Sequence, residues 1–199
     1  MSRQHHLTAI TGGIGAGKSI VSRVLTAMGY PVYDCDSRAR SLMDMSAEIK
    51  HAIALNIGAG VILPDDSIDR RLLAEIVFRN KQMLLTLNSI VHQAVRDDLA
   101  RWVSDRSSAL VFVETAILYE SGLDRVIDSE WHVTAPTDIR VNRVIARNRL
   151  SREHVLARIE AQSGTTPPKS SHNIITLVND DITPLLPQIE KALFETVLN

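Results

Sequence analysis

The sequence predicts an α/β protein in which five short strands form a parallel sheet flanked by helices. Two observations lead to this prediction. Short apolar runs of strand length alternate with longer segments of helical periodicity, and a glycine-rich segment directly follows the first run. The expected strands are 7–11, 30–34, 109–113, 131–135 and 174–178. The carboxyl ends of parallel strands share one edge of the sheet, so we expect ligands to bind there.

Helical periodicity separates these strands. The expected helices are 18–28, 37–57, 69–79, 81–104, 137–147 and 183–198. In the last of them, Thr183 is expected as the N-cap and Pro184 as the first helical residue.

The glycine-rich segment has the pattern G-x-x-x-x-G-K-S between the first strand and the first helix. Glycines let backbone N–H groups turn inward around a β-phosphate, Lys18 can bridge the β and γ oxygens, and the Ser19 hydroxyl can complete a Mg²⁺ shell. The positive end of the helix adds to the attraction for an anion. A flexible turn is the alternative, but the motif with both flanks favours a nucleoside triphosphate site. This segment is a P-loop, and its residues are Gly12, Gly13, Ile14, Gly15, Ala16, Gly17, Lys18 and Ser19.

A single domain over residues 1–199 is expected, with three regions. The nucleotide-binding core comprises 1–36, 107–142 and 173–199. Residues 37–106 lack a convincing strand and form a helical insertion that could cover an acceptor substrate. Residues 143–172 begin with basic side chains and contain Ser163-Gly164-Thr165-Thr166-Pro167-Pro168, which predicts a mobile lid.

Composition limits the class of protein. The chain is 45% hydrophobic and 23% charged, as in soluble globular proteins. Its net charge of −1 gives no global attraction to nucleic acid or to acidic membranes. No apolar stretch approaches the roughly 20 residues that span a bilayer, and the N-terminus leads into a strand rather than a signal-peptide core. We therefore expect a cytoplasmic protein with small-molecule ligands, as a monomer or weak oligomer.

The single cysteine, Cys35, is expected to be buried. One cysteine excludes an internal disulfide and a cysteine-rich zinc site.

Acidic residues follow two of the strands. Strand-like alternation places Asp34 and Asp36 on the same side if the second strand extends that far. We interpret Asp34 as a helix cap and favour Asp36 as a carboxylate that orients an acceptor hydroxyl and takes its proton. Glu114 resembles the acidic end of a Walker-B strand. It could hold Mg²⁺ directly or through water, contact the acceptor, or cap a helix.

Further polar residues are candidates for the acceptor side. Glu120 is either an acceptor ligand or an exposed acid. Arg70 and Arg71, with Lys81, could meet acceptor phosphates, although surface solvation is the alternative.

Five arginines fall within thirteen residues: Arg140, Arg143, Arg147, Arg149 and Arg152. The first three share one helical face. Such a charge run is often a solvated face. Beside a P-loop it could instead neutralise a transferring phosphoryl group and exclude water, and we favour this role for Arg143 and Arg147.

Together these motifs resemble the dephospho-coenzyme A kinase family over nearly the whole chain. The resemblance rests on residues 7–19, on Gly29-Tyr30-Pro31-Val32-Tyr33-Asp34-Cys35-Asp36, and on 69–78, 87–92 and 151–162. It implies a P-loop NTPase fold similar to nucleoside monophosphate kinases. It also implies ATP-dependent phosphorylation of the ribose 3′-hydroxyl of dephospho-coenzyme A, the last step of coenzyme A synthesis.

The resemblance also implies residue roles. Asp36 corresponds to the base for the 3′-hydroxyl, Arg40 and His92 to acceptor-side residues, and Asn179 to a residue near adenine. Arg143 and Arg147 fall where the family has its lid arginines.

The sequence departs from the family pattern at three places. Ala116-Ile117-Leu118-Tyr119-Glu120 replaces Pro-Leu-Leu-x-Glu, Gln93 replaces a proline, and His172-Asn173 replaces Ala-Asp. A kinase of another nucleoside, nucleotide or small metabolite is the alternative, because a P-loop alone does not select the acceptor. A nucleotide-dependent switch protein is less favoured, because the sequence lacks an Asn-Lys-x-Asp element and no long polar loop follows the first helix.

Overall fold

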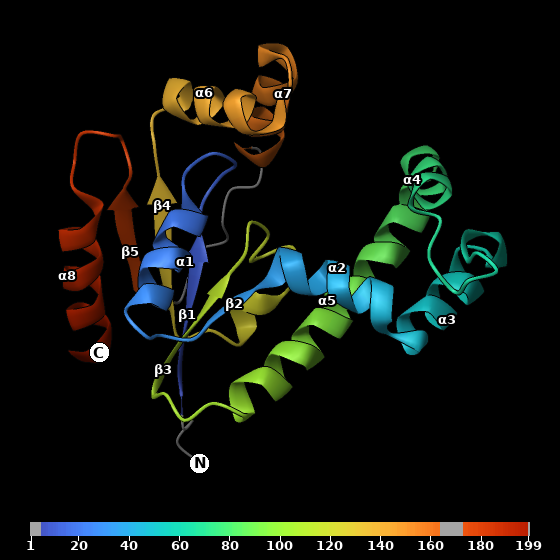
Figure 1. The fold of residues 1–199 in the computed structure, drawn as a ribbon, viewed down its shortest axis with the longest axis horizontal. Helices are drawn as coiled ribbons and strands as arrows, with labels where there is room; N and C mark the ends of the chain where they lie inside the picture. Colours follow the sequence, from blue (N-terminus) through green and yellow to red (C-terminus); the bar gives the residue numbers. More distant parts are fainter. Residues whose placement is uncertain (1–4, 164–172, 199) are drawn as a thin grey trace. The chain divides into compact units, whose positions relative to one another are not determined.

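The computed structural model describes residues 5–163 and 173–198 (Figure 1). Five strands form one sheet in the order β2-β3-β1-β4-β5. The pairs β1·β3, β1·β4 and β4·β5 are parallel, so the predicted sheet is confirmed. The strands are β1 (His6–Thr11), β2 (Val32–Asp34), β3 (Leu110–Glu114), β4 (Ser129–Thr134) and β5 (Asn173–Val178).

Strand β1 lies at the centre of the sheet and fixes where the P-loop begins. Five of its six residues are buried, as expected for a strand with a neighbour on each side. At its carboxyl end, Ile10 lies beside Glu114 of β3 and Thr11 lies beside His132 of β4. The P-loop therefore leaves the sheet between two strands whose last residues are polar.

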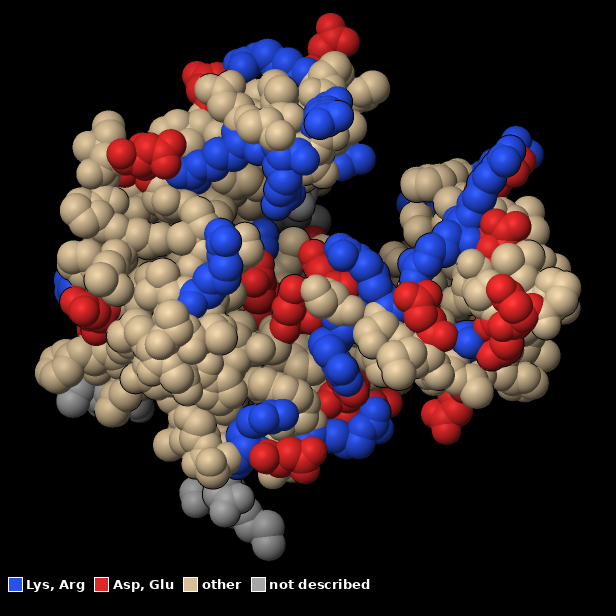
Figure 2. Space-filling model, in the orientation of Figure 1, with Lys and Arg blue, Asp and Glu red and all other residues tan. Residues whose placement is uncertain are grey.

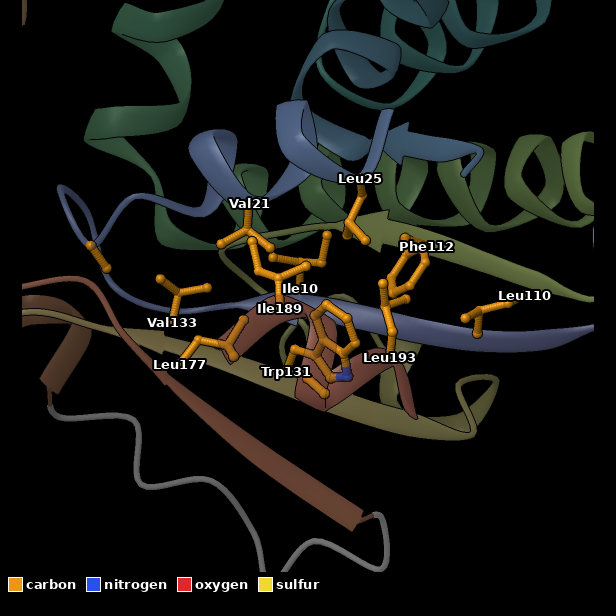
Figure 3. Packing of buried hydrophobic residues seen from close by; sticks show 12 residues of the cluster. Ile10, Val21, Leu25, Leu110, Phe112, Trp131, Val133, Leu177, Ile189 and Leu193 are labelled. Atoms are coloured by element: carbon orange, nitrogen blue, oxygen red, sulfur yellow. The ribbon is translucent and has the colours of Figure 1, made fainter. Parts of the chain in front are cut away.

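One face of the sheet is covered by α1 (Lys18–Ala27) and α8 (Leu185–Leu198) (Figure 3). Trp131 of β4 is fully buried at this face, 5.0 Å from the ring of Phe112, and its Nε1 donates to Thr196 on α8. The cluster of buried residues consists of Ile10, Ala16, Val21, Leu25, Leu110, Phe112, Trp131, Val133, Leu177, Ile189, Ala192 and Leu193. It ties the helix after the P-loop to the strands that carry the site.

Helices α6 (Thr137–Asn148) and α7 (Arg152–Ser163) follow β4. They pack together through Val141, Val144, Val155 and Ile159, and Ile14 of the P-loop packs against this cluster. The predicted helix 137–147 is therefore confirmed, and it is joined to the P-loop by an apolar contact. Residues 164–172, which include most of the predicted Ser163 to Pro168 segment and His172, lie outside the described residues.

Residues 1–33 and 107–199 form one compact unit, and residues 34–106 form another. Its helices are α2 (Cys35–Met45), α3 (Ala47–Asn56), η1 (Ala59–Val61), α4 (Arg70–Arg79) and α5 (Lys81–Ser104). Ile53 and Val61 are fully buried in its core. Arg38 of α2 donates to both carboxylate oxygens of Asp98 on α5, at 2.9 and 2.8 Å. As predicted, residues 37–106 form helices and contain no strand beyond the isolated bridge between Ile62 and Ile68.

Two predicted helices differ from the structure. The helix expected over 37–57 is broken at Ser46, whose backbone is extended and whose hydroxyl accepts a hydrogen bond from the N–H of Ile49 to cap α3. The last helix begins at Leu185, because the Thr183 side chain donates to Asp180 in the preceding turn instead of starting the helix at Pro184. Serine and threonine side chains offer such local bonds in competition with helix continuation.

No helix among residues 5–163 and 173–198 is long and apolar enough to cross a membrane. Cys35 is buried at the start of α2, as expected.

We predict that Trp131→Phe lowers the free energy of unfolding by about 1–3 kcal/mol, because it opens a cavity between β4 and α8 and removes the bond to Thr196. Urea denaturation followed by circular dichroism measures the change. As a control, Phe194→Leu alters a side chain on α8 that is 66% exposed, and it should change stability by less than about 0.5 kcal/mol.

Candidate active site

The P-loop adopts a conformation that depends on glycine at two positions in particular. Gly12 has φ 136° and Gly17 has φ 103°, in the region that side chains disfavour. A Cβ on Gly12 would lie 2.2 Å from the carbonyl oxygen of Val133, and one on Gly17 would lie 2.0 Å from Nδ2 of Asn179. Gly17 is also the N-cap of α1, so the amino end of this helix faces the loop without a capping side chain.

Side chains from outside the loop hold its carbonyl groups. Arg140 Nε donates to the Ile14 carbonyl at 2.9 Å, and Asn179 Nδ2 donates to the Ala16 carbonyl at 2.8 Å. The N–H of a trans peptide points away from its C=O, so these two bonds direct the Gly15 and Gly17 N–H groups to the opposite side of the loop. That orientation suits an anion cradle.

Arg143 supports the same loop from α6. Its guanidinium donates to the Gly15 and Ala16 carbonyls at 3.4 Å each, and to the Asn179 carbonyl at 3.0 Å. It also forms an ion pair with Asp181. The predicted Arg143 thus lies at the P-loop, beside Asn179.

The structure separates the arginines that share the face of α6. Arg140 lies against the loop, and its guanidinium occupies the space where a Cβ on Gly13 would go. Burial lowers the pKa of this guanidinium. Arg147 is exposed and donates to the neighbouring Asn148. Figure 2 shows Lys and Arg side chains gathered over α6 and α7, at the top of the view. The sequence favoured Arg143 and Arg147, whereas the structure brings Arg140 and Arg143 to the loop.

Lys18 and Ser19 are the first two residues of α1, and the other candidate metal ligand, Glu114, is the last residue of β3. Lys18 Nζ donates to the Gly12 carbonyl at 2.8 Å and to the Gly13 carbonyl at 3.5 Å, which keeps the ammonium at the loop. Ser19 is exposed in the first turn of α1, and Glu114 is half-buried at the carboxyl end of β3. The described residues contain no cluster of three or more His, Cys, Asp or Glu side chains that could hold a metal alone. A magnesium ion bound with a triphosphate takes most of its ligands from phosphates and water, so one hydroxyl and one carboxylate fit it.

The predicted acceptor residues belong mostly to the unit 34–106. Asp34 caps α2 by accepting from the Ser37 N–H at 3.1 Å, as predicted. Strand β2 ends there and does not extend to Asp36, so the strand alternation of Asp34 and Asp36, expected only for a longer strand, does not apply. Asp36 is exposed in the first turn of α2. Arg40 is exposed on the same helix, and His92 is half-buried on α5.

Two other acceptor candidates have different surroundings. Arg70 is the first residue of α4 and forms an ion pair with Asp44 at 2.5 Å. Glu120 belongs to the unit that contains the P-loop, and it is exposed in the turn after β3. The substrate roles of these residues stay predictions. The same holds for Asn179, whose described bonds go to the P-loop and Arg143 rather than to a nucleotide base.

Sequence reasoning missed a buried carboxylate beside the P-loop. Glu130 on β4 is 3% exposed and accepts hydrogen bonds from Thr11 at 2.5 Å and Tyr119 at 2.6 Å. His132 Nδ1 lies 3.6 Å from the same carboxylate. Burial alone would raise the pKa of Glu130, but the nearby His132 and the hydrogen bonds from Thr11 and Tyr119 outweigh it and lower the pKa. The signal in the sequence was an acid within an apolar strand, but the strand was predicted to begin one residue later, at Trp131.

The sheet order and the P-loop after its central strand define a P-loop nucleotide-binding protein of the α/β class. A family model described as dephospho-CoA kinase matches residues 6–183. The chain therefore belongs to the dephospho-CoA kinase family, and the resemblance inferred from its motifs is confirmed.

Individual relatives agree with the family match. A dephospho-CoA kinase of Porphyromonas gingivalis is 38% identical over 94% of this chain and 92% of its own length. One from Thermus thermophilus is 37% identical over 94% of this chain and 88% of its own length. A solved structure from Thermus thermophilus superposes with a TM-score of 0.75 at 34% identity, covering 98% of this chain and 97% of the other. The dephospho-CoA kinase structure from Campylobacter jejuni, with a TM-score of 0.67 at 23% identity, covers 95% of this chain and 96% of its own and supports the same fold.

We predict that Gly17→Ala weakens binding of ADP by about tenfold or more, because a side chain at this φ is strained and would displace Asn179. Isothermal titration calorimetry measures the affinity. Gly60→Ala is the matched control, because a Cβ there meets no atom within 4 Å. Equal ADP affinity in both variants would contradict the assigned cradle.

Proposed function

We propose that this protein transfers the γ-phosphoryl group of ATP to the ribose 3′-hydroxyl of dephospho-CoA, giving CoA and ADP in the last step of CoA synthesis. The observation that carries the proposal is a complete P-loop, backed by side chains from α6 and from the end of β5, in a chain that matches the family model over residues 6–183. A cytoplasmic location and a monomeric or weakly oligomeric state remain predictions from the sequence.

The donor half of the reaction is assigned to the P-loop. Its N–H groups and Lys18 bind the β- and γ-phosphates, and Arg143 and Arg147 supply further positive charge when the γ-phosphoryl transfers. Magnesium, when bound through Ser19 and Glu114, would neutralise phosphate charge. Arg143 now donates to two P-loop carbonyls and pairs with Asp181, so in this role its guanidinium would turn from these partners toward the phosphate.

The acceptor half is assigned to Asp36 and its neighbours. The carboxylate of Asp36 orients the 3′-hydroxyl and takes its proton as the oxygen attacks the γ-phosphorus. The bond from that phosphorus to the β–γ bridging oxygen breaks, and ADP leaves. Arg40, Arg70, His92 and Glu120 are assigned to dephospho-CoA, and Arg70 would exchange its ion pair with Asp44 for substrate phosphate.

We predict that Asp36→Asn lowers kcat by about 100-fold or more, since the variant keeps the shape of the side chain but loses the proton acceptor. Its affinity for ADP should stay within about twofold of the original, because the P-loop is unchanged. A coupled assay of ADP release with dephospho-CoA measures the rate, and calorimetry measures the affinity.

Glu48→Gln is the control, because Glu48 is likewise an exposed acid in the first turn of a helix of the same unit. Unchanged turnover in Asp36→Asn would rule out Asp36 as the base.

A panel of other nucleosides and nucleotides tests the identity of the acceptor. ADP release that is not stimulated by dephospho-CoA would overturn the proposed function.

A further inference from the structure

The buried Glu130 carboxylate joins two segments that lie far apart in the sequence. One oxygen accepts from the hydroxyl of Thr11 at 2.5 Å, and the other accepts from the hydroxyl of Tyr119 at 2.6 Å. His132 Nδ1 lies 3.2 Å from the Thr11 hydroxyl oxygen. Only 3% of Glu130 is exposed, so water contributes little to holding the carboxylate.

The hydrogen-bond partners of Glu130 suit its ionised form. Thr11 and Tyr119 each have one hydroxyl hydrogen, and both donate it to the carboxylate. The Thr11 oxygen is then left to accept, which assigns a hydrogen to Nδ1 of His132. Glu130 thus accepts from two hydroxyl donors, and a third donor, Nδ1 of His132, supports the Thr11 oxygen, as suits an ionised carboxylate.

Thr11 connects Glu130 to the base of the donor site. It is the last residue of β1, and the next residue, Gly12, opens the P-loop. The Gly12 carbonyl accepts the hydrogen bond from Lys18. A displacement of Thr11 would therefore reach the residue that orients the Lys18 ammonium.

Tyr119 connects Glu130 to the turn that carries Glu120. Leu118 in this turn is 2% exposed, and the N–H of Gly122 donates to the Tyr119 carbonyl at 3.1 Å. The turn is thus held by a buried side chain, by its own backbone and by the Tyr119 hydroxyl. Glu120 is exposed between these fixed points.

We infer that Glu130 is a positioning residue that sets the distance between the P-loop and the turn of Glu120, and hence between the donor phosphate and the acceptor. This inference rests on the proposed function for the identity of the acceptor. In phosphoryl transfer the attacking oxygen must approach the phosphorus in line with the leaving oxygen. A small misplacement of the acceptor site relative to the donor site therefore slows the reaction more than it weakens binding. Glu130 touches neither reacting group and acts through Thr11 and Tyr119.

The decisive variant is Tyr119→Phe, which removes one hydroxyl and leaves the ring. We expect kcat at saturating ATP and dephospho-CoA to fall about tenfold, with ADP affinity within about twofold of the original. Thr11→Val and Glu130→Gln should also lower kcat. Because both hydroxyls act through one carboxylate, the double variant Thr11→Val/Tyr119→Phe should be no slower than Glu130→Gln.

Two controls match these changes. Tyr30→Phe removes a tyrosine hydroxyl elsewhere in the same unit, and Glu190→Gln neutralises an exposed acid on α8. Both should keep the original kcat. Circular dichroism confirms the folded fraction of every variant, and Tyr119→Phe carries the test if Glu130→Gln does not fold.

A folded Tyr119→Phe protein with kcat within twofold of the original would overturn the inference. So would a loss of kcat that is fully matched by a loss of ADP affinity. These outcomes differ from failure of the proposed function, in which the original protein itself does not phosphorylate dephospho-CoA.

Acid stability tests the charge of Glu130 independently. Its pKa in the folded protein lies below the ordinary value of 4.5, so its stabilising contribution is present above pH 4.5 and is lost as the pH falls through the lower folded value. Below pH 4.5, Tm should therefore fall less steeply with pH in Glu130→Gln than in the original protein. Equal slopes would contradict an ionised bridge.

Discussion

The site depends most on the hydrogen bonds that hold the P-loop carbonyls from outside. A loop of glycines has many conformations, and fixing each residue costs about 1–2 kcal/mol of conformational entropy. Arg140, Arg143 and Asn179 offset part of this cost by binding successive carbonyl groups of Ile14, Gly15 and Ala16. The phosphate-facing N–H groups are consequently oriented before any nucleotide arrives, which is the preorganisation that electrostatic catalysis needs.

Through the same bonds, residues of α6 and of the end of β5 become part of a site whose motif lies more than 120 residues earlier in the sequence. The carbonyls of Ile14, Gly15 and Ala16 accept bonds from donors that the sheet brings to the carboxyl edge of β1. Strand β4 lies next to β1 and leads into α6, and β5 lies next to β4 and leads into Asn179. The strand order thus selects which side chains complete the loop.

The sequence was sufficient for the elements and for the residues of the P-loop, because strand and helix periods and the glycine pattern are local properties. It was not sufficient for Ser46, where a single side-chain cap breaks a continuous apolar pattern. The sequence also did not indicate that Arg140 binds the P-loop, because an arginine on a helix face has the same sequence pattern whether it contacts solvent or a carbonyl group. Glu130 was missed because the partners of a buried carboxylate, Thr11 and Tyr119, are distant in sequence. The positions of Asp34 as a cap and of Cys35 as a buried residue followed from short-range rules and were correct.

The contact of Ile14 with the α6–α7 cluster also has a consequence for the order in which the protein is made. Chains emerge from the ribosome amino end first, and structure forms only when its partners are available. The side chains that Ile14 and Ala16 need come from residues 126 and 163 positions later. The P-loop therefore acquires its binding geometry only after Asn179 has been synthesised, so a product truncated before that residue would carry the P-loop sequence without the side chains that hold it.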